Sequence, residues 1–157
     1  LARKQPIRGG IEISWGVELH PNELYGAVIA NSYELEHEVA QYPRIVIGER
    51  AIKLLKDHSD APVDFDDKIA VYQKTIAKTC LDITSVDMDG QYILDYLGDS
   101  FTTQFTSPEN KNLFKNSYSY IIEQLQHYKT TKNTKLVLRY SMLESYFNDN
   151  KNLHTNP

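Results

Sequence analysis

The hydrophobic pattern of the chain changes period close to residue 22. Apolar and polar residues alternate from Ile7 to Leu19, which is typical of a strand with one buried face. From Leu24 to Ala40 the apolar residues recur on one helical stripe, with Asn22 as the expected N-cap. Pro43 disfavours helix in the residue before it, so the helix ends there, and Arg44–Ile47 is expected to form a short buried strand. This order of strand, helix and strand predicts an α/β or α+β layer.

The later part of the chain is expected to be mostly helical. A helix is predicted over Glu49–Lys56 and is followed by an expected loop at 57–62. The spacing of Ile69, Tyr72, Ile76 and Cys80 predicts another helix, with these four side chains on its apolar stripe. Two strands flank Asp87–Gly90, whose Asp-Gly pair is a strong hairpin signal. Two further helices after Pro108 are joined by a short loop, which predicts a helical hairpin.

Composition limits the class of protein. A chain of 157 residues is enough for one ordinary domain. We place a candidate boundary between residues 58 and 59, giving segments 1–58 and 59–157, and a single merged domain remains the alternative. The net charge of −4 argues against a nucleic-acid partner held by phosphate attraction. The chain has no long apolar run and no signal-peptide pattern, so we expect a cytoplasmic protein without a membrane partner.

Isolated chemical groups give few site candidates. The five histidines show no metal-ligand spacing, and we expect no metal site in this chain. Cys80 is expected to be a buried structural thiol rather than a nucleophile. Asp87-x-Asp89-Gly90 lacks the later ligands of a calcium loop and is interpreted as a turn. A basic patch near residues 129–139 is interpreted as a solvated helix end, with a nucleic-acid contact as the alternative. The tyrosines of the last two helices are expected to pack in a core, with an aromatic interface as the alternative.

Four short motifs carry a more specific signal. They are Arg8-Gly9-Gly10-Ile11, Tyr25-Gly26, Tyr33-Glu34-Leu35-Glu36 and Tyr42-Pro43-Arg44-Ile45. Together they resemble the second half of a class III nucleotide (adenylate/guanylate) cyclase domain, in particular the divergent branch that contains the pyrimidine cyclases of Pycsar antiphage defence. The resemblance implies an α+β fold: a ferredoxin-like cyclase half-domain, with a mixed sheet and helices on one face, and a mainly helical C-terminal extension.

The same resemblance implies a reaction and a set of partners. Such cyclases form a head-to-tail homodimer with the active site at the interface, where two aspartates bind Mg²⁺ or Mn²⁺. They convert a nucleoside triphosphate to a 3′,5′-cyclic mononucleotide and pyrophosphate. The metal-binding aspartates of the family lie on strands that precede Arg8. We therefore expect this chain to be the later part of a longer protein.

The positions that match the family's polar residues hold different chemistry here. The nucleotide-binding Asn and the Arg four residues later are matched by Ala30 and Glu34, and the base-selecting Asp is matched by Ala27. Asn31 is adjacent but rotated by about 100° around the helix. Asn31 and Glu34 are therefore the only, weak, catalytic candidates.

Three functional hypotheses remain open at this point. The first is a segment of a nucleotide cyclase that is inactive by itself and serves antiphage signalling within the complete protein. The second is a non-catalytic cyclase-like module for dimerisation or ligand sensing. The third is an unrelated small binding domain.

Overall fold

The computed structural model describes residues 4–103 and 108–150, with side chains from residue 112 in the second range. The chain forms two compact units, each built from separate segments. Unit 1 contains residues 1–8, 41–44 and 96–157, and unit 2 contains residues 9–40 and 45–95. The expected boundary between residues 58 and 59 falls inside a helix of unit 2.

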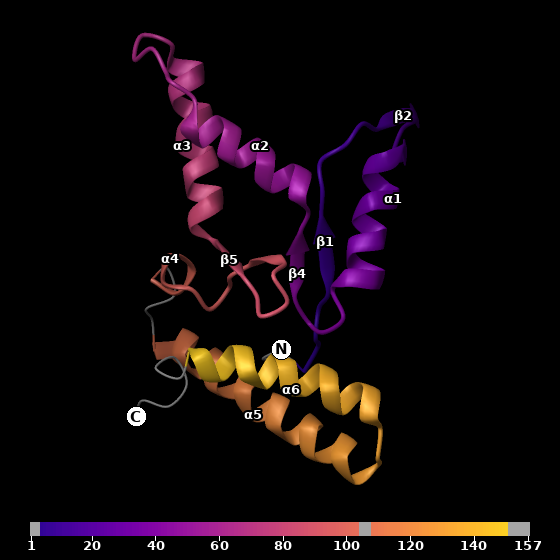
Figure 1. Ribbon diagram of the computed structural model, residues 1–157. Helices are drawn as coiled ribbons and strands as arrows, with labels where there is room; N and C mark the ends of the chain where they lie inside the picture. Colours follow the sequence, from indigo (N-terminus) through magenta and orange to yellow (C-terminus); the bar gives the residue numbers. More distant parts are fainter. Residues whose placement is uncertain (1–3, 104–107, 151–157) are drawn as a thin grey trace. The chain divides into compact units, whose positions relative to one another are not determined.

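The elements follow one another along the chain as shown in Figure 1. In unit 2 they are β1 (Gly9–Ile11), β2 (Val17–His20), β3 (Glu23–Tyr25), α1 (Ala27–Glu34), the π-helical turn η1 (Leu35–Val39), β4 (Ile45–Ile47), α2 (Glu49–Asp60), α3 (Lys68–Asp82), β5 (Thr84–Val86) and β6 (Tyr92–Leu94). In unit 1 they are α4 (Asp99–Thr102), α5 (Pro108–Thr130) and α6 (Thr134–Asp149).

A mixed four-stranded sheet forms the centre of unit 2. Its strand order is β1-β4-β6-β5, with β1 parallel to β4 and the other pairs antiparallel. Strands β2 and β3, helix α1 and turn η1 together connect β1 to its parallel neighbour β4, and α1 runs beside β1 in Figure 1. The protein is therefore an α+β protein with a mixed sheet.

The close approach of the α1 segment to β1 depends on Gly10. A Cβ atom at Gly10 would lie 2.7 Å from the Leu35 Cβ and would also overlap the Ser32 carbonyl oxygen. No side chain larger than hydrogen fits there, because two of these neighbours belong to the helix rather than to a mobile side-chain tip. Glycine at position 10 therefore allows the close backbone approach of this segment to β1.

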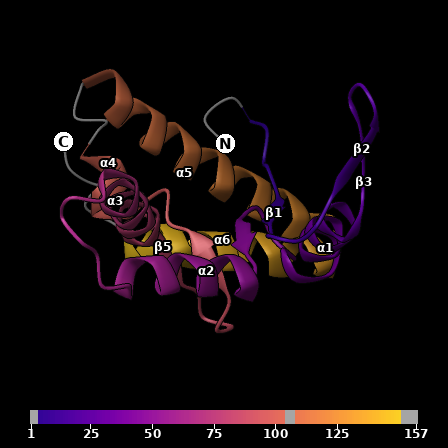
Figure 2. The ribbon, with the colours of Figure 1, turned by 90° about the horizontal axis from the view of Figure 1, so that it is seen from above.

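The long strand expected over Ile7–Leu19 is wrong in extent. Strand β1 stops at Ile11, and β2 pairs with β3 in a separate two-stranded antiparallel sheet. The hairpin projects beyond α1 in Figure 2. The alternation detected two strands but not the break between them, where the Glu12 side chain turns toward the beginning of α2.

The helix expected from Leu24 begins later. Asn22 has a φ of 68° in the hairpin turn, its N–H donates to Glu18 Oε1 at 2.8 Å, and the next three residues form β3. Gly26, with a φ of 132°, is the N-cap of α1. The pairing of β3 with β2 therefore overrides the local helical periodicity.

Helix α2 is longer than expected and extends to Asp60. A Lys53–Asp57 ion pair one turn apart joins residues of this last part of the helix. The loop begins only at Ala61, the residue before Pro62, where the backbone is extended.

Helix α3 forms where it was predicted, but it buries a different face. Ile69, Tyr72 and Ile76 are exposed, whereas Ala77 is buried. The less exposed side of the helix also contains Ala70 and Lys74, whose ammonium donates to the Ala61 carbonyl at 2.8 Å. Small alanine side chains let a neighbouring element pack closely against this side of α3. The stripe of larger side chains that includes Ile69, Tyr72 and Ile76 therefore did not identify the buried face of the helix.

The β5–β6 hairpin and its turn are confirmed. The Gly90 N–H donates to the Asp87 carbonyl at 2.9 Å, and Gly90 has a φ of 82°. The Asp87 and Asp89 carboxylates accept N–H groups of Met88 and Gln91 within the same turn. These aspartates therefore stabilise a turn, as the sequence indicated.

In unit 1, helices α5 and α6 form the predicted hairpin. Its buried core consists of Tyr42, Leu97, Ile121, Leu125, Tyr140, Leu143 and Phe147. Tyr118, Tyr120, Tyr128 and Tyr146 pack against this core, partly buried. Core packing of these tyrosines is confirmed.

Candidate functional site

The four candidate residues of the resemblance all lie on α1. Asn31 and Ala27 are half-buried, and Ala30 and Glu34 are exposed. Ala27, Ala30 and Glu34 are spaced three and four residues apart, which places them on one side of the helix. This side presents two methyl groups and a carboxylate. The Ala27, Ala30 and Glu34 side chains offer no hydrogen-bond donor to a phosphate at neutral pH, and the Asn31 amide, four residues after Ala27, is half-buried.

The beginning of α1 is held by the segment between β1 and β2, which has no regular secondary structure. The Val28 N–H donates to the Trp15 carbonyl at 3.2 Å. A Cβ at Gly26 would lie 2.7 Å from this same carbonyl oxygen. The backbone of Trp15 therefore fixes the start of α1, and the indole is left 69% exposed.

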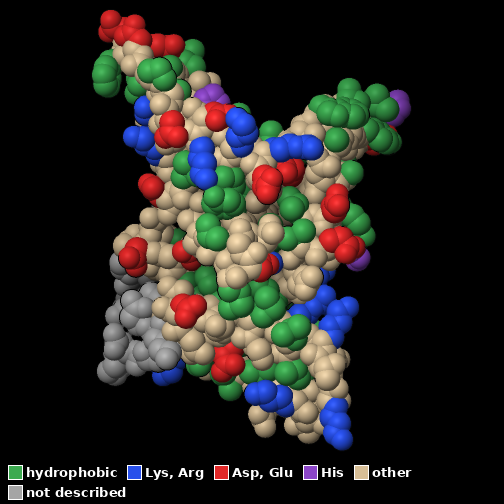
Figure 3. All heavy atoms as spheres, in the orientation of Figure 1, with side chains coloured by type: hydrophobic (Ala, Val, Ile, Leu, Met, Phe, Trp, Pro, Cys, Tyr) green, Lys and Arg blue, Asp and Glu red, His purple; other side chains and the backbone are tan. Residues whose placement is uncertain are grey.

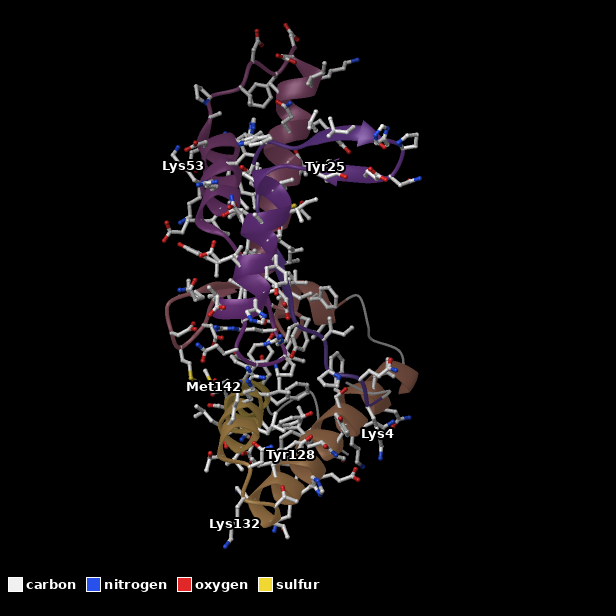
Figure 4. All side chains as sticks on the ribbon, turned by 90° about the vertical axis from the view of Figure 1, so that its right-hand side faces the viewer. Lys4, Tyr25, Lys53, Tyr128, Lys132 and Met142 are labelled. Atoms are coloured by element: carbon white, nitrogen blue, oxygen red, sulfur yellow. The ribbon has the colours of Figure 1, made fainter. Side chains whose placement is uncertain are left out.

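Large apolar side chains are exposed throughout this part of unit 2. We name the following nine residues the apolar surface: Ile11, Ile13, Trp15, Val17, Leu19, Leu24, Tyr25, Ile29 and Tyr33. Figure 3 shows hydrophobic side chains gathered over the β2–β3 hairpin, and Figure 4 shows Tyr25 on that hairpin. The alternation over Ile7–Leu19 had led us to expect one buried face, and that expectation is wrong for the members of the apolar surface between Ile11 and Leu19.

The exposed area is large for a chain of this size. Each of the nine side chains is about half exposed, so at 150–200 Å² per large side chain they present roughly 700–900 Å² together. The largest apolar patch of a typical monomer is about 300–600 Å². One partner of a standard protein interface contributes about 800 Å². The summed exposed area is comparable to one side of a standard interface, and it is spread over both faces of the β2–β3 hairpin because Leu24 and Tyr25 are consecutive in β3.

The same segment is strongly acidic. Residues 9–40 contain six glutamates and no lysine or arginine. Four of the six, Glu18, Glu23, Glu34 and Glu38, are exposed. The surface therefore combines apolar contact area with one sign of charge, which sequence reasoning missed because it treated these glutamates only as the polar face of a helix or strand.

Glu12 has a structural role that the sequence pattern did not indicate. Its Oε1 accepts the N–H groups of Ile13 at 2.8 Å and of Ala51 at 3.1 Å, in the first turn of α2. A Cβ at Gly48, the N-cap of α2, would overlap this carboxylate. Glu12 thus supplies the anion that the positive end of a helix favours.

Cysteine, histidine and possible metal-ligand groups were the other site candidates. Cys80 is half-buried rather than buried. The His37 ring stacks on Tyr33, with 5.4 Å between ring centroids. In residues 4–103 and 108–150, no cluster of three or more His, Cys, Asp or Glu side chains could hold a metal ion.

The basic patch lies in unit 1, where α5 ends and α6 begins. Lys129, Lys132 and Lys135 are exposed, and Arg139 is half-buried. Leu138, beside Arg139, is 61% exposed. Lys132 lies at the turn of the helical hairpin, and its side chain points away from the helices in Figure 4.

Comparison of the chain with family models, curated proteins and solved structures found no match. Within the part of the chain that the structure describes, no helix combines the length and the apolar character needed to cross a bilayer.

Proposed function

We propose that this chain is a non-catalytic, cyclase-like self-association module whose binding site is the apolar surface of unit 2. The observation that carries the proposal is the exposure of nine large apolar side chains between residues 11 and 33. Leaving this area in water is unfavourable by about 25 cal/mol for each Å², so its burial against a second copy favours association.

The residue types support a protein interface. Trp15, Tyr25 and Tyr33 are among the exposed residues, and tryptophan and tyrosine are enriched at the energetic centres of interfaces. Trp15 is presented by a backbone that α1 already holds, so little main-chain ordering is needed when a partner binds.

The chemistry of α1 favours a non-catalytic function. The methyl groups of Ala27 and Ala30 cannot contact a triphosphate as donors. The exposed carboxylate of Glu34 would repel it. Stabilisation of charge on a transferred phosphoryl group needs donors or cations at this place.

Sedimentation velocity tests the proposal with two double variants. Trp15→Ser/Tyr33→Ser removes two aromatic anchors, and Ile69→Ser/Tyr72→Ser removes equally exposed side chains from α3 as the matched control. We expect the wild type and the control to dimerise with similar affinity. The first variant should bind at least about 100-fold more weakly, because each interface anchor contributes 2 kcal/mol or more.

Circular dichroism of both variants checks that they remain folded. A wild type that stays monomeric at every concentration would contradict the proposal. So would a Trp15→Ser/Tyr33→Ser variant that associates as the wild type does.

A segment of a nucleotide cyclase is the second candidate. The packing of α1 against β1, and of β1 beside parallel β4, is compatible with a ferredoxin-like cyclase half-domain. In that case the complete protein would use Mg²⁺ or Mn²⁺ held by residues outside this chain, and antiphage signalling would be its setting.

Incubation of this chain with each nucleoside triphosphate and Mg²⁺ or Mn²⁺ tests whether the chain by itself is non-catalytic. We expect no cyclic mononucleotide from this chain, measured by chromatography of the products. Turnover by these residues alone would reject the non-catalytic proposal and would require metal ligands that we have not recognised.

A further inference from the structure

We propose that the apolar surface of one copy binds the basic end of the α5–α6 hairpin of a second copy. This inference rests on the proposed self-association and identifies the surface that the apolar surface meets. Its chemistry is defined by Lys129, Lys132, Lys135 and Leu138.

Charge argues against pairing of the apolar surface with itself. The segment that carries it has six glutamates and no lysine or arginine, and four of these glutamates are exposed. Contact between two identical copies of this surface would bring like charges together while excluding the water that screens them. A complementary partner surface should therefore be basic and partly apolar.

The end of the α5–α6 hairpin has this composition. Residues 124–143 contain three lysines, one arginine and no acidic residue. The three lysines are exposed, and Leu138 adds an exposed apolar contact. Lysine stems can also lie along apolar area while the ammonium groups reach carboxylates.

The charge difference extends to the whole of each unit. Unit 2 contains 16 acidic and 6 basic residues, whereas unit 1 contains 5 acidic and 11 basic residues. A contact between unit 2 of one copy and unit 1 of another therefore joins opposite charges, and long-range attraction speeds their encounter. Pairing of unit 2 with unit 2, or of unit 1 with unit 1, would instead join like charges.

Charge reversal on the two surfaces provides the test. The acid-reversed variant is Glu23→Lys/Glu34→Lys, and the base-reversed variant is Lys132→Glu/Lys135→Glu. Asp60→Lys/Asp66→Lys and Lys68→Glu/Lys78→Glu make the same charge changes at exposed positions of unit 2 away from the apolar surface, and they serve as matched controls.

We expect each reversed variant alone to bind at least about tenfold more weakly than the wild type in sedimentation equilibrium. The controls should bind as the wild type does. An equimolar mixture of the acid-reversed and base-reversed variants should recover affinity, because each reversed surface then faces its opposite. Added salt should weaken wild-type association.

The base-reversed variant is decisive. If it associates as tightly as the wild type, the basic hairpin is not the partner surface. The proposal made here is then overturned while self-association through the apolar surface stands. If the wild type does not associate at all, both this inference and the proposed function fail.

Discussion

A single side chain, Glu12, joins the beginning of α2 to the segment that follows β1. Its carboxylate accepts the N–H of Ala51 across 39 residues of sequence, and it occupies the space where a side chain at Gly48 would lie. Glycine is needed at position 48 for room, since its φ of −68° is open to any residue. The Glu12 carboxylate can therefore take its place at the beginning of α2 only because Gly48 has no Cβ atom.

Gly48→Ala should lower the free energy of unfolding by about 1–3 kcal/mol, because the added methyl displaces the Glu12 carboxylate from the helix end. Gly9→Ala is the control, since its Cβ would lie 3.5 Å from Ile45 Cγ1, an ordinary contact. Urea denaturation followed by circular dichroism measures both changes.

A double-mutant cycle isolates the clash. In a Glu12→Ala background, Gly48→Ala should lower the free energy of unfolding by clearly less, because the carboxylate that the new methyl group would overlap is absent. If Gly48→Ala lowers the free energy of unfolding equally in the wild type and in Glu12→Ala, the glycine is required for a reason other than room for the carboxylate.

At the scale of elements, the α5–α6 hairpin is built around tyrosine rings. Tyr140 is buried, and its ring centroid lies 5.3 Å from that of Tyr128 and 6.5 Å from that of Tyr120. Burial, followed by a hydrogen bond with Tyr120, raises the pKa of Tyr140 well above its usual value near 10. The folded hairpin therefore holds this phenol in its neutral form.

This shift predicts a loss of stability at high pH. Above about pH 10 the unfolded chain releases the Tyr140 proton while the folded chain keeps it, so folding becomes less favourable as the pH rises. Tyr140→Phe should remove up to about 1.4 kcal/mol of this dependence for each pH unit. Denaturant unfolding between pH 9 and pH 11, a range around the usual tyrosine pKa of about 10, measures how the free energy of unfolding changes with pH.

The exposed residue Tyr72 supplies the comparison, because Tyr72→Phe should leave the slope of the wild type unchanged. Identical slopes for the wild type and Tyr140→Phe would mean that the Tyr140 hydroxyl ionises as readily in the folded chain as in the unfolded one.

At the scale of the whole molecule, the two compact units of the chain also differ in the sign of their net charge. Its net charge of −4 conceals an acidic unit 2 and a basic unit 1. The segments of unit 1 come from three places in the sequence. A local window of sequence therefore cannot reveal this division.

If copies associate as proposed, the melting temperature of the wild type should rise with protein concentration, because association stabilises only the folded state. Trp15→Ser/Tyr33→Ser should melt at a temperature that does not depend on concentration. Differential scanning calorimetry over a wide concentration range measures both. A wild-type melting temperature independent of concentration would count against association of the folded chain.

Local chemistry was sufficient for several elements. Asp87–Gly90 determined the β5–β6 turn because its hydrogen bonds close within five residues. The α5–α6 hairpin followed from helical periodicity and a short loop, and Asn133 caps α6 through its side chain. Strand β4 was also predicted, because Pro43 and Gly48 flank a short apolar run.

The candidate site was less accessible from sequence. Positions 27, 30, 31 and 34 were placed correctly on one helix, since their spacing fixes their relation within it. That Trp15, Tyr25 and Tyr33 remain exposed did not follow from their pattern, because periodicity identifies a common face but not whether anything covers it.

The sequence by itself determined those elements whose hydrogen bonds and caps lie within a few residues. The tertiary structure alone decided that α3 packs through Ala77 rather than Ile76 and that Glu12 caps α2. Each of these depends on a partner distant in the chain or in a different element. The free energy of that contact outweighs the local preference of the residues that make it.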